Sequence, residues 1–378
     1  MRSVAGARAD DPGNDLVDRR RADGIAWLHR REPTRFAAMN PDPDRRFVVC
    51  GETLIDLVRD ERDPGDTFAS GWQALSAGGP MNIAVALARL GANSHFLGRI
   101  STDEFGGQLR GHMIKAGVDL DLAVTSDQFT SLAVLSLDEQ GKASYAFHFD
   151  ETANFSWQPD ELPELTSRDW LQIGSLPIVV PPGDRVLLDW VRGVPASISL
   201  DINVRPTVIT DPAEYWRRVR PWLQALAGKG VVKASDDDVA FLARGLEVDE
   251  TTDGRVVSSG DSAADLPPSS QPEPWRGTSE RWLADFDLPL IVITRGESGA
   301  SALTADGWTD VPGYRAELVD TVGAGDTFMA GFLDGYVRLG QDLAEALRRG
   351  ASAASIVCSR QGAQPPTAEE VVALQRGA

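Results

Sequence analysis

Apolar and polar positions recur along the chain with two periods, which predict strands and helices in turn. Strands buried on both faces are predicted where short, mainly apolar runs occur, at 47–51, 171–174, 196–201, 230–233 and 290–294. Helices are predicted where apolar residues recur at helical spacing, at 83–90, 184–193, 212–227, 328–339 and 343–358. Strands that alternate with helices in this way are typical of parallel βαβ units, which are joined by right-handed crossovers. The pattern therefore predicts an α/β fold with a mostly parallel central sheet.

Three stretches depart from this alternation. Residues 131–137 and 143–149 alternate apolar and polar positions on either side of a polar turn, which predicts a β-hairpin. Residues 1–46 are charged, contain several prolines and show little periodicity, so we predict a disordered N-terminal extension. Residues 247–280 are poor in apolar side chains and rich in Ser, Thr, Asp and Pro, which predicts a flexible surface insertion. One folded domain over 47–378 is expected.

Composition narrows the class of protein. A formal net charge of −19 argues against nucleic acid as a partner, because phosphate backbones repel an acidic surface. No apolar run is long enough for a membrane span, and the first residues lack the apolar middle of a secretion signal, so a cytoplasmic enzyme is expected. The two cysteines, Cys50 and Cys358, lie in apolar settings and are expected to be free thiols.

Candidate chemistry is concentrated in one turn, where Gly323, Ala324 and Gly325 precede Asp326. The turn follows a strand-like region at 311–319 and opens a helix that we expect to begin near Asp326. Unpaired amides at a helix start can bind an anion, and a carboxylate beside that anion can serve as a base for a nearby hydroxyl. This combination suggests phosphoryl transfer to an alcohol. The alternative is a tight turn in which the aspartate merely caps the helix.

A second candidate region lies near the start of the predicted domain. Glu52 and Asp56 follow the first buried strand, where open α/β sheets place their ligands. Gly78 and Gly79 permit close approach to the main chain, and Asn82 can offer both a donor and an acceptor to hydroxyl groups. A solvated strand end and a glycine turn before a core helix are the alternatives.

These two regions together carry a resemblance to a known family. Gly78-Gly79-Pro80-Met81-Asn82, with the helix that ends at Gly91, resembles the first signature of the ribokinase-like (PfkB) carbohydrate kinases, and 320–326 resembles the second. The resemblance covers roughly 47–373 and leaves the extension and the 247–280 insertion without counterpart. It implies a three-layer α/β/α core and a small β-sheet lid from about 53–76 and 131–149. It also implies ATP and Mg²⁺, and a potassium-like ion.

The resemblance also implies residue roles. Asp326 is the expected catalytic base, and the amides of Gly323, Ala324 and Gly325 are expected to stabilise the transferred phosphoryl group. Substrate contacts are expected from Asp56, Gly78, Gly79, Asn82 and Arg205. Nucleotide contacts are expected from Ser235, Thr294, Gly296, Gly299, Gly325 and Gly362. Metal contacts are expected from Asp238, to magnesium through water, and from Asp320 and Val322, to a monovalent cation. A surface role for Arg205 and a helix-capping role for Asp238 are the alternatives.

Other classes of protein fit less well. A P-loop kinase is disfavoured because GxxxxGK[ST] is absent, and a Rossmann dehydrogenase because Phe328 stands where the third glycine belongs. By resemblance, fructose is the expected substrate and fructokinase the expected activity. The rival activities are those of a 2-keto-3-deoxygluconate kinase, a ribokinase and then a nucleoside kinase. A catalytically silent sugar-binding regulator on the same fold is the alternative from another class. Pairing of lid edges in a homodimer is a further expectation.

Overall fold

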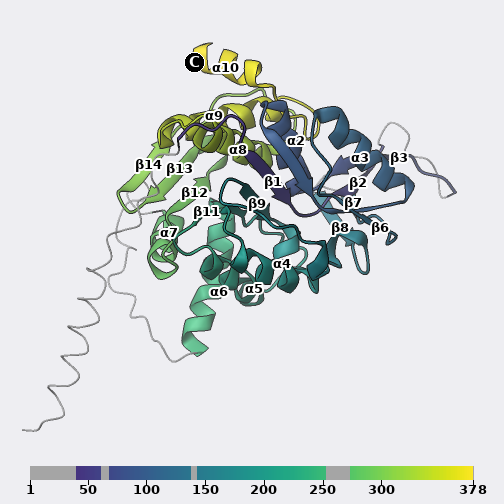
Figure 1. Ribbon diagram of the computed structural model, residues 1–378, viewed down its shortest axis with the longest axis horizontal. Coiled ribbons are helices and arrows are strands. Elements are labelled where there is room, and N and C mark those ends of the chain that lie inside the picture. The colour runs from purple at the N-terminus through teal and green to yellow at the C-terminus, as the bar shows by residue number, and fades with distance from the viewer. Residues whose placement is uncertain (1–39, 61–67, 138–142, 253–272, 378) are drawn as a thin grey trace, which may run out of the picture. The chain divides into compact units, whose positions relative to one another are not determined.

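The computed structural model describes residues 40–60, 68–137, 143–252 and 273–377 (Figure 1). The chain divides into two units, Met1–Arg35 and Phe36–Ala378, and the first lies wholly outside the described residues. The prediction of a disordered extension over 1–46 falls outside them as far as residue 39. The turn of the predicted hairpin and the middle of the predicted 247–280 insertion fall outside them as well.

The main sheet contains eight of the strands in the described part of the chain. In chain order they are β1 (Arg46–Cys50), β4 (Asn93–Leu97), β9 (Trp170–Gly174), β10 (Ser197–Asp201), β11 (Gly230–Ser235), β12 (Leu290–Thr294), β13 (Ala300–Thr304) and β14 (Gly307–Val311). In space they are ordered β14-β13-β12-β11-β10-β9-β1-β4. The six from β12 to β4 are mutually parallel, and β13 and β14 add an antiparallel edge. The predicted mostly parallel sheet is confirmed.

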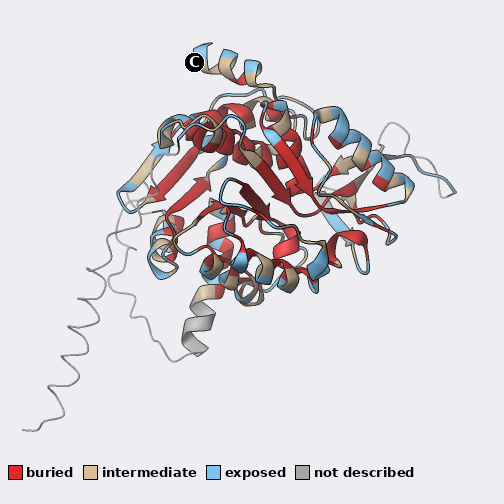
Figure 2. Ribbon diagram, viewed as in Figure 1, coloured by how far each residue is buried: buried red, intermediate tan, exposed pale blue. Residues whose placement is uncertain are grey.

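Helices cover both faces of this sheet, and the pleat of the strands explains how (Figures 1 and 2). Along β11, Val232 and Ala234 pack into one core and Val231 into the other. The first core is closed by α4 (Gly183–Gly193), α5 (Pro212–Ala225), α6 (Asp236–Thr252) and α7 (Pro274–Asp285). The second is closed by α2 (Gly79–Arg89), α3 (Glu104–Ala116), α8 (Ala324–Leu333), α9 (Leu343–Cys358) and α10 (Ala368–Gly377). This is the three-layer α/β/α arrangement expected from the sequence.

A smaller sheet provides the expected lid. Its four strands, ordered β3-β2-β7-β8, are β2 (Leu54–Arg59), β3 (Trp72–Ala77), β7 (Leu132–Leu137) and β8 (Ala143–His148). β7 and β8 pair antiparallel as the predicted hairpin, and β2 joins β7 in parallel. Where their side chains are described, β2 and β3 are only partly buried, unlike the central strands of the main sheet. A separate strand pair is β5 (Arg99–Ser101) with β6 (Val124–Ser126).

The helix expected to begin near Asp326 begins two residues before it, at Ala324. Two other expectations about local structure are wrong. No strand occupies 312–319, because Pro312 lacks a backbone N–H and β14 ends just before it. The 247–280 region is helical at both ends, in α6 and α7, and α7 is anchored by the buried tryptophans Trp275 and Trp282 at helical spacing.

Candidate active site

A cleft opens at the carboxyl ends of the parallel strands, between the main sheet and the lid. Residues from distant parts of the chain line it, with the lid supplying Asp56 and the aromatic rings of Tyr145 and Phe147. Carboxyl ends of parallel strands are where open α/β sheets place their ligands. Of the residues expected from the sequence, ten line this cleft: Asp56, Gly78, Gly79, Asn82, Arg205, Val322, Gly323, Ala324, Gly325 and Asp326.

The first turn of α8 forms one wall of the cleft. Its N-cap is Gly323, which has a φ of 76° and no side chain to cap the helix. A Cβ at this position would lie 2.7 Å from Cβ of Ala363, so only glycine fits. The Ala324 amide donates to Thr321 O (3.2 Å), while among the described residues none accepts a hydrogen bond from the N–H of Gly323 or Gly325. This helix start therefore keeps free amides for an anion.

Asp326 lies in the same turn and is buried, with 7% of its surface exposed. Its Oδ2 accepts a hydrogen bond of 2.9 Å from Nδ2 of Asn82 at the first turn of α2, across 244 residues of chain. Burial raises the pKa of Asp326, while the Asn82 hydrogen bond and the positive charges of Lys233 and Arg205 oppose that rise. A carboxylate held in this way is a good proton acceptor when a hydroxyl reaches it.

Two further acidic groups of the cleft come from the loop after β1 and from the lid. Glu52 accepts a hydrogen bond of 3.2 Å from the Gly79 amide, and burial raises the pKa of Glu52 to about 8. Burial also raises the pKa of Asp56 to about 6, against the opposing charge of Arg205. A Cβ on Gly79 would lie 3.3 Å from Oδ1 of Asp326, so a side chain there would crowd that carboxylate.

Arg205 lies in the loop after β10 and Asp238 in the first turn of α6, and the structure supports different roles for them. Arg205 lines the cleft, and its guanidinium donates to Oδ1 of Asn203 (2.6 Å), so the arginine is not a simple surface residue. Asp238 accepts from the amides of Val204 (2.9 Å) and Ser235 (2.8 Å), and its own amide donates to Oγ of Ser235 (3.0 Å). This reciprocal pair is a capping box for α6, the alternative role considered for Asp238.

The residues expected to contact nucleotide and cations lie mostly outside this cleft. Ser235 and Thr294 are neighbours in the β11–β12 register, at the same edge of the sheet. Asp320 accepts from the amides of Val322 (3.0 Å) and Gly362 (2.8 Å), which ties the turn at 323–325, called the anion turn below, to the segment after α9. The expected site residues that do not line the cleft are Ser235, Asp238, Thr294, Gly296, Gly299, Asp320 and Gly362. Their roles stay predictions.

Sequence reasoning missed a buried ion pair below the cleft. Lys233 Nζ lies 3.0 and 2.9 Å from the two carboxylate oxygens of Asp201. The signal was present, since a lysine stands inside the apolar run of β11 and an aspartate closes β10. A charge in a doubly buried strand requires a partner, so this lysine could have been singled out.

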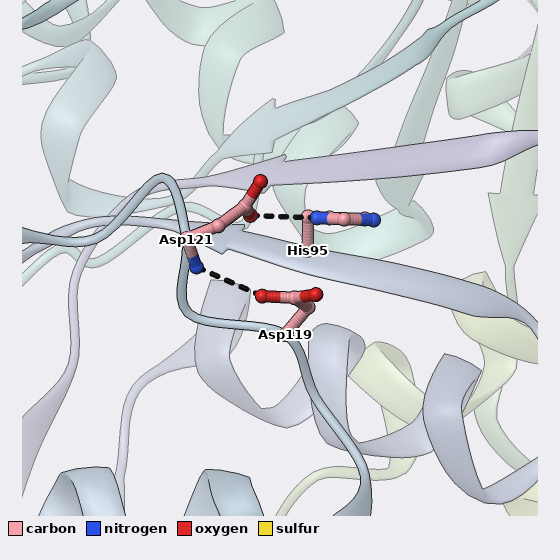
Figure 3. Close-up of side chains that lie close together, drawn as sticks. All are labelled: His95, Asp119 and Asp121. Atoms are coloured by element: carbon pink, nitrogen blue, oxygen red, sulfur yellow. Dashed lines mark hydrogen bonds and ion pairs between the residues drawn. The ribbon is translucent and has the colours of Figure 1, made fainter.

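Three residues of types that can bind a metal ion lie close together on the edge strand β4 and the loop after α3: His95, Asp119 and Asp121 (Figure 3). His95 Nδ1 and Oδ1 of Asp121 share a hydrogen bond of 2.7 Å, and His95 Nε2 and Oδ1 of Asn93 share one of 3.0 Å. Asp119 accepts from the Asp121 amide (2.9 Å). Both ring nitrogens are engaged and both aspartates are exposed, so these contacts account for the cluster as a tie between strand and loop.

Comparison with known proteins gives a consistent result. The sequence pattern of the pfkB family carbohydrate kinases matches residues 44–240 and 282–370. The fructokinase of Rhizobium leguminosarum bv. trifolii is 32% identical over 291 residues, which cover 76% of this chain and 78% of that protein. The fructokinase of Klebsiella pneumoniae is 28% identical over 305 residues, covering 78% and 85%.

Solved structures agree on the fold. The fructokinase of Xylella fastidiosa with bound ATP superposes with a TM-score of 0.70 at 23% identity, covering 88% of this chain and 99% of that one. A double mutant of the fructokinase from Vibrio cholerae O395, with fructose, ADP and potassium ion bound, gives a TM-score of 0.69 at 22% identity, covering 89% and 99%. No helix among the described residues has the length and apolar character that crossing a membrane requires.

Proposed function

The chain belongs to the pfkB family of carbohydrate kinases, and we propose that within this family it is an ATP-dependent fructokinase. The reaction transfers the γ-phosphoryl group of ATP to a primary hydroxyl of D-fructose and yields fructose 6-phosphate and ADP. The observation that carries the proposal is the 2.9 Å contact between Asn82 and Asp326 in the cleft. It joins the sugar-side region to the base beside the uncapped start of α8.

The base and the turn act together. The Asp326 carboxylate accepts the hydroxyl proton while the sugar oxygen attacks the γ-phosphorus and the bond to the β-phosphate oxygen breaks. Amides of the 323–325 turn stabilise the charge on the migrating phosphoryl group. The N–H groups of Gly323 and Gly325 find no acceptor in the described part of the chain, which supports that role. Magnesium, when bound, neutralises charge on the phosphates.

Sugar binding is assigned to the opposite wall. Asp56, Arg205 and Asn82 present charged and polar groups to hydroxyls, while Gly78 and Gly79 let the sugar approach the main chain. Tyr145 and Phe147 of β8 supply apolar cover from the lid. Fructose is favoured because the relatives described above are named fructokinases. 2-keto-3-deoxygluconate and ribose are the rival substrates, because small changes in a pocket redirect specificity.

Further assignments complete the proposal. ATP is expected to lie along Ser235, Thr294, Gly296, Gly299 and Gly362, with magnesium near Asp238. A potassium ion near Asp320 and Val322 would steady the turn that their hydrogen bond already shapes. A homodimer through the lid edges and a cytoplasmic location are carried forward as predictions.

A coupled assay of ADP release tests the proposal. Purified full-length protein is supplied with MgATP and, in separate reactions, fructose, ribose, 2-keto-3-deoxygluconate and adenosine. We expect the highest kcat/KM for fructose. A higher value for another sugar would replace fructose as the substrate. Saturable sugar binding without any ADP release would favour the silent regulator.

A further inference from the structure

A buried ion pair lies directly below the anion turn. We propose that Lys233, held by Asp201, is a positioning residue that keeps the Asp326 carboxylate ionised and ready to accept a proton. The inference rests on the proposed function, since it concerns the base of that reaction. It assigns a purpose to two charged groups that neither line the cleft nor belong to the expected site.

The pair is built into the sheet. Asp201 and Lys233 are neighbours in the parallel register of β10 and β11, at the carboxyl ends of both strands. Both carboxylate oxygens of Asp201 contact Nζ, at 3.0 and 2.9 Å, and only 4% of the lysine and 2% of the aspartate side chain are exposed. Such burial is costly for two charges, so the pair calls for an explanation beyond joining two strands that already share backbone hydrogen bonds.

The direction of the lysine is set by the pleat. Lys233 points to the same face as Val231, which packs in the core below α2 and α8, because side chains two residues apart share a face. A Cβ built on Gly325 would lie 3.1 Å from Nζ of Lys233. The ammonium group therefore lies against the residue that precedes Asp326, in the first turn of α8.

Four charged side chains from different elements interact electrostatically with Asp326. They comprise two cations and two acids: Lys233 on β11, Arg205 after β10, Glu52 after β1 and Asp201 on β10. From α2 only the neutral Asn82 bonds to it, and the buried Arg349 of α9 pairs with Asp334 instead. Burial raises the pKa of Asp326, and both cations oppose that rise. The negative charge of Asp326 in turn raises the pKa of Asp201, which burial and its neighbours bring to about 6.

Two substitutions should act in opposite directions. Lys233→Met removes a cation near Asp326, so the acidic limb of kcat against pH, measured at saturating sugar, should move up by about one unit. At a fixed pH on that limb, kcat should fall about tenfold with little change in the KM for sugar. Asp201→Asn keeps an acceptor for Lys233 but removes a negative charge, so the limb should move down. The inference would be overturned if the acidic limbs of both variants stayed at the wild-type pH, or if both limbs moved in the same direction.

A matched control separates electrostatics from loss of stability. Arg349 and Asp334 form an ion pair with side-chain exposures of 4% and 0%, which match the burial of the Lys233 pair, but neither residue lines the cleft. Arg349→Met should lower the melting temperature without moving the acidic limb. Lys233→Arg keeps the charge and should restore the wild-type limb where Lys233→Met has moved it.

A direct titration keeps this test independent of the proposed function. The Asp326 carboxyl can be followed by ¹³C NMR in the folded protein without substrate, with Asp326→Asn identifying its signal. The same opposite shifts are expected for Lys233→Met and Asp201→Asn. If wild-type protein phosphorylates no sugar, the proposed function fails, and the titration still decides the role of Lys233. If Lys233→Met does not fold, the nearly isosteric Asp201→Asn decides it.

Discussion

Helices α6 and α8 both place an aspartate at their third residue, yet the two helix starts differ. In α6, Asp238 and Ser235 cap each other through reciprocal hydrogen bonds, so the amides of these two residues are satisfied within the protein. In α8, Gly323 offers no side chain, and Asp326 turns to Asn82 on another helix. An aspartate at the third residue thus caps the start of α6, whereas the aspartate at the third residue of α8 leaves that helix start uncapped.

The difference shows what a helix needs in order to bind an anion. Unpaired amides at a helix start are normally satisfied by a Ser, Thr, Asp or Asn at the N-cap. Replacing that residue by glycine frees them, at a cost in local stability that the buried contacts of α8 must offset. An aspartate at the third residue of a helix therefore indicates a function only where its side chain takes no part in capping that helix.

The largest expected effect is on kcat, and it comes from a substitution at the uncapped start of α8. Asp326→Asn should lower kcat by about 10²- to 10⁴-fold and change the KM for sugar little, because proton transfer occurs only in the transition state. The measurement is steady-state ADP release at saturating ATP. Asp103→Asn at the N-cap of α3, outside the cleft, is the control. Asparagine also caps helices but removes one acceptor oxygen from Thr130, so stability should fall while kcat is kept. Near-normal turnover of Asp326→Asn would remove it as the base.

The glycine that keeps α8 open comes next. Gly323→Ala combines a left-handed backbone with a Cβ 2.7 Å from Cβ of Ala363, so the turn must move. We expect kcat to fall by at least about tenfold, since displaced amides stabilise the transferred group less well. Gly91→Ala, at a φ of 86° with open space around it, should show only the backbone strain of about 1–2 kcal/mol. Equal kinetics in the two variants would show that the turn does not bind the phosphoryl group.

The closed helix start is tested by Asp238→Asn. Asparagine keeps only one acceptor oxygen, so the N–H of Val204 or of Ser235 loses its partner. The free energy of unfolding should therefore fall by about 1 kcal/mol, read from denaturant melts. If Asp238 also reaches magnesium through water, the Mg²⁺ concentration for half-maximal activity should rise in the same variant. An unchanged Mg²⁺ requirement would leave capping as its role.

The last prediction concerns another carboxyl of the cleft, Glu52, and is read from stability rather than from turnover. Burial raises the pKa of Glu52 from 4.5 to about 8, so the folded protein binds a proton there that the unfolded chain releases. Wild-type stability should therefore fall as pH rises between these values, while Glu52→Gln lacks this loss. The free energy of unfolding of the variant, relative to that of wild type, should rise by roughly 2–4 kcal/mol between pH 5 and pH 9, measured by melts at each pH. A pH-independent difference would show that Glu52 is ionised in the folded state.

Much of the fold could be predicted because strands buried on both faces carry few polar residues. The apolar runs locate β1, β9, β10, β11 and β12 to within about two residues. The antiparallel edge was not predicted, because β13 and β14 contain small and polar residues that give no such run. The helical ends of the 247–280 region were missed because two tryptophans of α7, rather than many apolar residues, hold it in place.

The candidate site was predictable where local backbone chemistry defines it and less so where tertiary packing does. Glycine turns at 78–79 and 323–325 are visible in the sequence because few other residues adopt such conformations. The partner of Asp238 is set by which chain segments pack together, so capping and metal binding could not be separated beforehand. Lys233 was overlooked because its strand was read only for its apolar residues.

The hydrogen bond between Asn82 and Asp326 has a consequence for how the protein is made. Synthesis proceeds from the N-terminus, so the ribosome releases the sugar-side wall long before the last third of the chain emerges. A truncated product that stops before α8 lacks both the acid and the amide turn. Under the proposed function, phosphotransfer thus requires a nearly full-length polypeptide, and unfinished chains cannot consume ATP by this route.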